Sequence, residues 1–154
     1  MRAYYIPLVA GILLTISAFL PWVHVAGEAM RGVPDIPGLW IVGLGASAVL
    51  LATLSIITRK NSRHPLLLVG LIALAIMFLS WRILPRSATE RARTIAQAAA
   101  IVERHAVAES PSAEVGLGIY LGMLASFVIT GFGMTIVVRR VQTPYGVVSP
   151  DDDV

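Results

Sequence analysis

The chain has 154 residues, of which 56% are hydrophobic and 14% are charged, and its formal net charge is +3. This composition excludes an ordinary soluble domain and is typical of a membrane protein with several spans. The basic residues lie at the ends of apolar stretches and in one long polar segment, without interleaved aromatic residues, so no nucleic-acid partner is predicted. The chain has no cysteine, which excludes disulfides and thiolate metal sites.

The first apolar stretch, residues 6–25, predicts a membrane-spanning helix. Trp22 lies near its far end and is interpreted as an interface anchor, because tryptophan prefers the level of the lipid headgroups. His24 is the one candidate cofactor ligand. A haem or pigment ligand is normally a histidine inside a span, and a histidine at a span edge more often has no such role. The glycines and prolines that follow, up to Pro37, predict turns without a regular element.

Residues 39–57 and 65–84 predict the second and third spans, joined by a connection so short that they must form an antiparallel hairpin. Small residues recur along span two at intervals of three and four, which lets a neighbouring helix approach closely. They are Gly45, Ala48, Ala52 and Ser55. Trp40 near the start of span two, and Trp81 and Arg82 at the end of span three, are further interface anchors, and the long Arg82 side chain can reach the headgroups.

The polar segment after span three predicts an amphipathic helix over residues 89–108. Ser87 and Glu90 form an S-x-x-E capping box, which marks a helix start. A narrow apolar face follows at intervals of three and four residues, and we interpret it as a partner face. Its residues are Ala92, Ile95, Ala99 and Val102.

Residues 115–138 predict the fourth span, a charge-free run closed by Arg139 and Arg140. Small residues recur along it at strict four-residue spacing and form a second packing face. They are Gly118, Gly122, Ser126 and Thr130. The polar, acidic tail, residues 141–154, has too few apolar residues to fold alone.

The predicted fold is therefore an all-α integral membrane protein with four transmembrane helices in one domain, residues 1–140, plus one amphipathic extramembrane helix between spans three and four. A raw count of basic residues ties between the two sides. Arg59, Lys60 and Arg63 lie in a very short loop, where positive charge orients a protein most strongly. We therefore expect the protein to lie in a plasma or inner membrane, with both termini in the cytoplasm. The helix over residues 89–108 is then expected on the opposite side of the membrane.

Trp22 followed by Gly38, Leu39 and Trp40 is similar to the W and GLW signature in the first extracellular loop of claudin-like four-span proteins. That family pairs the signature with two cysteines, which this chain lacks, and places it in a strand-bearing loop well before span two. The resemblance covers four residues and implies only a shared four-span organisation.

No catalytic motif and no metal-ligand spacing is present, so neither an enzyme nor a metal site is predicted. The leading hypothesis is a small accessory or structural subunit that packs against larger membrane subunits, or against its own copies, through the small-residue faces and the outer helix. The same faces would also serve to pack the chain's own four helices. The alternatives are a homo-oligomeric channel or small-ligand transporter, and a cofactor- or pigment-associated subunit. Bound membrane lipid is expected, and no cofactor is predicted.

Overall fold

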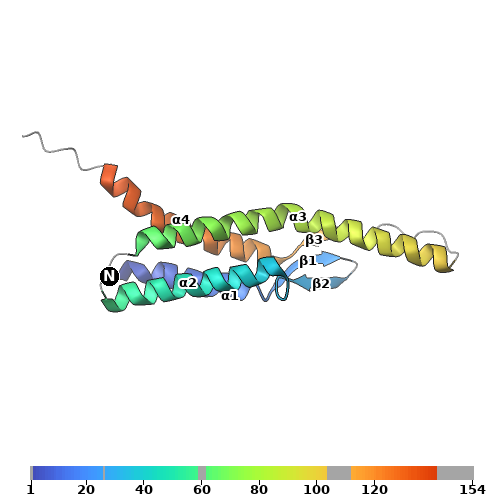
Figure 1. The fold of residues 1–154 in the computed structure, drawn as a ribbon, viewed down its shortest axis with the longest axis horizontal. Helices are drawn as coiled ribbons and strands as arrows, with labels where there is room; N and C mark the ends of the chain where they lie inside the picture. The colour runs from blue at the N-terminus through green and yellow to red at the C-terminus, as the bar shows by residue number, and fades with distance from the viewer. Residues whose placement is uncertain (1, 26, 59–61, 104–111, 142–154) are drawn as a thin grey trace, which may run out of the picture.

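A computed structural model describes residues 2–25, 27–58, 62–103 and 112–141. Helices form an elongated bundle with a small sheet at one end, and the N-terminus lies at the other end (Figure 1). In chain order the elements are a short 3-10 helix η1 (Arg2–Tyr4), α1 (Tyr5–Ser17), β1 (Pro21–Val25), β2 (Glu28–Arg31), α2 (Ile36–Thr58), α3 (Arg63–Glu103), β3 (Ala113–Val115) and α4 (Leu117–Val141).

Three helices in the described part of the chain are long and apolar enough to cross a membrane, namely Ile36–Thr58, Arg63–Val102 and Leu117–Thr135. They confirm the second, third and fourth predicted spans as apolar helices. The predicted span over residues 6–25 is wrong in its second half. Its helix α1 has only 13 residues, about 20 Å at 1.5 Å per residue, which is shorter than a hydrocarbon core of about 30 Å. A fourth full-length span is therefore not confirmed.

The segment after α1 forms a three-stranded antiparallel sheet in the order β2-β1-β3. Our expectation of turns without a regular element up to Pro37 was wrong, and the fold is not purely α-helical. Trp22, Val23 and Val25 are buried on β1, and large or β-branched side chains of this kind favour strands. Pairing of β1 with β3 joins Val23 to Val115, a contact between distant parts of the chain that local periodicity cannot reveal.

The prediction of a separate outer helix is also wrong, because α3 runs without a break from Arg63 to Glu103. The Ser87 hydroxyl donates to the carbonyl of Leu84 at 3.0 Å, inside the helix, so it does not cap a new one. The Thr89 hydroxyl donates to the carbonyl of Pro85 in the same way, at 2.9 Å. With 41 residues, α3 is about 60 Å long. Residues 104–108 of the predicted helix, and residues 142–154 of the predicted tail, lie outside the described residues.

The bundle is closed at the N-terminal end by a cluster of aromatic and polar groups. The rings of Tyr4 and Phe132 meet edge to face, with centroids 5.1 Å apart. The Arg63 guanidinium lies 5.5 Å from the centroid of the Phe132 ring. The Tyr4 hydroxyl accepts a hydrogen bond from the backbone N–H of Ser62 at 3.2 Å. This cluster ties the starts of α1 and α3 to α4.

Candidate functional site

The small residues of α2 face the bundle interior. Gly45, Ala48, Ala52 and Ser55 are all buried. A Cβ atom added at Gly45 would lie 2.9 Å from the carbonyl oxygen of Gly11, and one added at Gly11 would lie 3.1 Å from the Cβ of Ala48. Because these distances leave no room for larger side chains, the face of α2 is in close contact with α1.

The small residues of α4 are likewise packed against other helices of the chain. Gly118, Gly122, Ser126 and Thr130 are all buried. A Cβ atom at Gly118 would lie 2.8 Å from the carbonyl oxygen of Ser17, and one at Gly122 would collide with the end of Met77. On the other side, a Cβ atom at Gly70 would lie 2.7 Å from the backbone nitrogen of Thr130. This face therefore contacts α1 and α3 of the same chain.

Trp22, predicted as an interface anchor, lies in the core between the sheet and the bundle, with its side chain packed against protein. Its side chain is 1% exposed, and its indole N–H donates to the carbonyl of Ser17 at 2.8 Å. The ring packs against Gly32 and Gly118 so closely that a Cβ atom at either glycine would overlap it. The glycines around the sheet are the sequence feature that could have indicated this contact, because a buried indole needs backbones that approach closely.

Trp40, Trp81 and Arg82 lie on the outside of the bundle. Trp40 is 59% exposed and Trp81 is 37% exposed, and Arg82 is also exposed. This placement is what an interface anchor needs, since its side chain must reach the headgroups.

His24 is exposed on β1, where its register partners are Ala29 and Glu114. Within the residues that the structure describes, no group of three or more His, Asp or Glu side chains could hold a metal ion. His24 is thus not brought together with a second and third ligand there.

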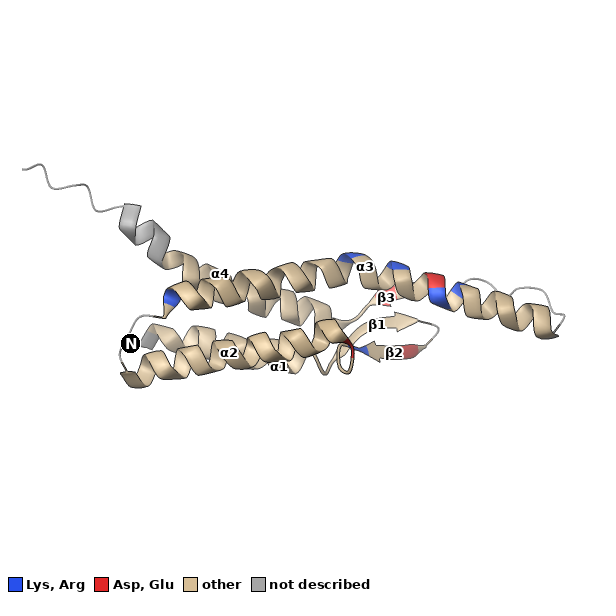
Figure 2. Cartoon of the chain, viewed as in Figure 1, with Lys and Arg blue, Asp and Glu red and all other residues tan. Residues whose placement is uncertain are grey.

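The last part of α3, residues 86–103, projects beyond the bundle and is called the arm below (Figure 1). Most of its charged residues lie close together near the sheet, as Figure 2 shows. The predicted partner face begins against the sheet, where Ala88 is 7% exposed and Ala92 packs against the core. Farther along, Ile95 and Val102 are 70% and 82% exposed, and Ala99 is exposed as well.

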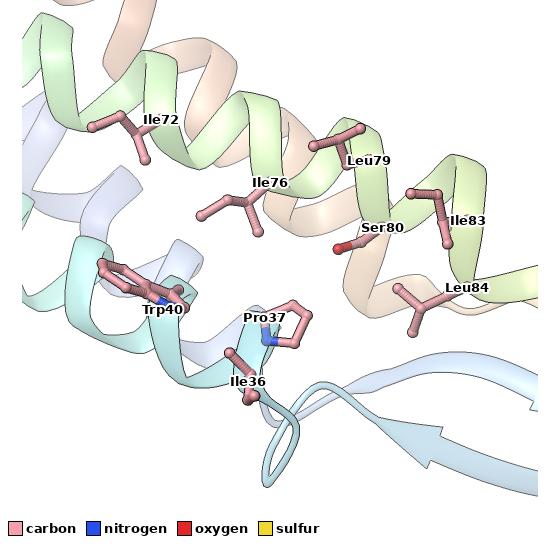
Figure 3. A pocket seen from close by; sticks show the side chains of 9 residues that line it. All are labelled: Ile36, Pro37, Trp40, Ile72, Ile76, Leu79, Ser80, Ile83 and Leu84. Carbon is pink, nitrogen blue, oxygen red and sulfur yellow. The ribbon is translucent and has the colours of Figure 1, made fainter. Parts of the chain in front are cut away.

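A groove of about 500 Å³ opens between α2 and α3, and we call it the α2/α3 groove. Figure 3 shows the side chains that line it, which are aliphatic or aromatic apart from Ser80. A second pocket of about 290 Å³ lies beside it and shares Ile36, Pro37 and Leu84 with it. This second pocket is polar at its edge, where Asp35, Ser87 and Arg91 contribute to its lining.

Comparison with known proteins adds no relative: no family model, no curated protein and no solved structure matches this chain.

Proposed function

We propose that this protein is an accessory subunit of a larger membrane assembly and that its arm is the docking element. The observation that carries the proposal is the contrast between two kinds of apolar face. The small residues of α2 and α4 are covered by the chain's own helices, whereas Ile95 and Val102 on the arm are 70% and 82% exposed. Exposed apolar residues gathered on one face are typical of a protein interaction site.

The arm is long enough to reach a partner outside the membrane. A helix of 41 residues is about 60 Å long, and a bilayer with its headgroups is about 40–45 Å thick. The part that projects is therefore at least about 15 Å long. Burying Ile95 and Val102 against a partner would contribute about 1.5–3 kcal/mol for each side chain.

Charge on the arm favours a different protein over a second copy as the partner. Two copies in one membrane would be related by an axis along the membrane normal, so their arms would run parallel and bring equivalent residues together. Arg86, Arg91 and Arg93 outnumber Glu90 and Glu103 on the arm, so two arms of equal net positive charge would repel. The partner we propose is a helical extramembrane part of another membrane protein, with acidic residues flanking its apolar face.

The orientation belongs to the same proposal. With the short basic loop between α2 and α3 in the cytoplasm, both termini lie there too, in a plasma or inner membrane. The arm and the sheet then face the opposite compartment. A partner that docks on the arm would be engaged from outside the cytoplasm.

The test compares two doubly substituted chains, each with two added negative charges. Ile95→Glu with Val102→Glu alters the exposed apolar face, while Thr94→Glu with Gln97→Glu alters positions off that face. We expect a protein that co-purifies with the unaltered chain to be lost from the first variant and kept by the second, with equal thermal stability of both. Equal retention by both variants contradicts docking on this face. Loss of a self-associated species, with no other protein affected, contradicts the choice of a different protein as partner.

A further inference from the structure

We propose that the α2/α3 groove and the polar pocket beside it form one site for a zwitterionic phospholipid with a primary amine in its headgroup. One acyl chain would occupy the groove, and the headgroup would lie between Asp35 and Arg91. This inference goes beyond the proposed docking role, since it concerns a different ligand and a site that shares Arg91 with the arm but not the exposed face of Ile95 and Val102.

The dimensions of the groove match one leaflet of a bilayer. Along α3 its lining runs from Ile72 to Leu84, which is about 18 Å at 1.5 Å per residue. One leaflet contributes half of a hydrocarbon core of about 30 Å, or about 15 Å. A chain that entered from the sheet side would therefore be covered over the depth of its own leaflet. The wall is aliphatic and aromatic, and the exposed Ile36 and Trp40 stand at its rim.

The polar pocket lies where the headgroup of such a lipid would be. It continues the groove through Ile36, Pro37 and Leu84, and Asp35 directly precedes α2. Side chains on a helix tilt toward its N-terminus, so Arg91 is directed back along α3 toward the membrane. Val23 and Met30 of the sheet also line this pocket, together with Ser87 and Ala88 of α3.

The two charged groups select the class of headgroup. A guanidinium forms strong charge-assisted hydrogen bonds with phosphate, and a carboxylate forms them with an ammonium group. An anionic headgroup without an amine would satisfy Arg91 but would place negative charge beside Asp35. A headgroup with both a phosphate and a primary amine complements both residues, and that is the chemistry of phosphatidylethanolamine.

The molecule contains its own control surface. A groove of about 430 Å³ lies between α1 and α4, lined by residues such as Val9, Leu13, Leu121 and Leu124. Its lining includes neither an acid nor a base. The two grooves are similar in size, but only the α2/α3 groove adjoins a pocket with both an acidic and a basic side chain. Selection between headgroups is therefore expected only there.

The experiment is native mass spectrometry of the full chain, titrated with phosphatidylethanolamine or phosphatidylglycerol of identical acyl chains. We expect one phosphatidylethanolamine to be retained at least tenfold more tightly than phosphatidylglycerol. Asp35→Asn should weaken retention of phosphatidylethanolamine and strengthen that of phosphatidylglycerol, because it removes the negative charge beside the anionic headgroup, whereas Arg91→Gln should weaken both. Asp35 and Arg91 are exposed, so these variants are expected to fold.

A matched pair of larger side chains locates the acyl chain. Ile76→Trp fills the α2/α3 groove and should reduce retention of the lipid tenfold, whereas Val9→Trp in the groove between α1 and α4 should leave it unchanged. Equal retention of the two lipids, or equal effects of the two tryptophans, would overturn the proposal. The arm variants Ile95→Glu and Val102→Glu should not alter lipid retention, so failure of one proposal is distinguishable from failure of the other.

Discussion

Trp22 is the residue on which the junction between the sheet and the bundle depends. Its ring packs against Gly32 and Gly118, and its backbone carbonyl accepts a hydrogen bond from the N–H of Gly116 at 2.7 Å. One residue thus connects β1, the segment before α2 and the start of α4. Trp40, with 59% exposure, has no comparable packing and serves as its control.

Trp22→Ala is expected to destabilise the protein by about 3–5 kcal/mol, the usual effect of removing a buried tryptophan side chain. The cause is the cavity left beside Gly32 and Gly118, together with the lost hydrogen bond to Ser17. Denaturant unfolding in detergent measures the change in the free energy of unfolding. Trp40→Ala should change it by less than about 1 kcal/mol, and similar losses in the two variants would show that Trp22 has no special packing role.

The glycines of α4 provide a second prediction at this scale. A Cβ atom at Gly122 would collide with Met77, whereas one at Gly131 would have no atom within 4 Å. Gly122→Leu should therefore lower stability by at least the ~1–3 kcal/mol typical of overpacking, and Gly131→Leu should be neutral or slightly stabilising because leucine favours helix. Thermal unfolding of the purified chain distinguishes the two. If Gly122→Leu folds normally and loses only a partner, its face is an intermolecular contact.

Among the elements, α3 departs most from the prediction, and the reason lies in Pro85. A proline removes one hydrogen bond from a helix and bends it or ends it, and the S-x-x-E sequence that follows favours a new start. In the folded chain Ser87 and Thr89 bond to carbonyls one turn back, and Ala88 packs against the core. Packing on the sheet supports helix on the far side of the proline, and the sheet itself was not predicted.

Continuity of α3 is measurable because the chain has no native cysteine. Spin labels on Ala75→Cys and Gln97→Cys are expected to be about 33 Å apart with a narrow distribution, since 22 residues of helix rise by about that length. Double electron–electron resonance measures this distance. A broad distribution, or a mean well below about 28 Å, would indicate two helices with a break between them.

The elements that the sequence predicted well are those with a local signal. Apolar runs of about 20 residues identified α2, the first part of α3, and α4, and small residues at intervals of three and four identified the buried faces of α2 and α4. Local spacing could not show which helix would cover Gly45 or Gly118. Nor could it show that Pro21–Val25 pairs with Ala113–Val115, because that contact joins segments separated by most of the chain.

For the whole molecule, the first prediction concerns the orientation of the chain in the membrane. Ser62 and Gln97 lie toward opposite ends of the described α3 region, so single cysteines at these positions should be labelled from opposite sides of the membrane. An impermeant maleimide added to intact cells should label Gln97→Cys and leave Ser62→Cys unlabelled until the cells are opened. The reverse pattern would invert the proposed topology and place the arm in the cytoplasm.

In the whole molecule, the small residues of the bundle pack against the chain's own helices, whereas the arm carries an exposed apolar face. The most direct measurement of this division is photo-crosslinking in intact membranes, with a photoreactive residue introduced at Ile95 or Val102 on the arm, at Gln97 on its other side, or at Gly131 on the bundle. We expect adducts with a second protein from Ile95 and Val102, and none from Gln97 or Gly131. Adducts from Gly131 alone, or equal adducts from Gln97 and Ile95, would contradict docking through the exposed face of the arm.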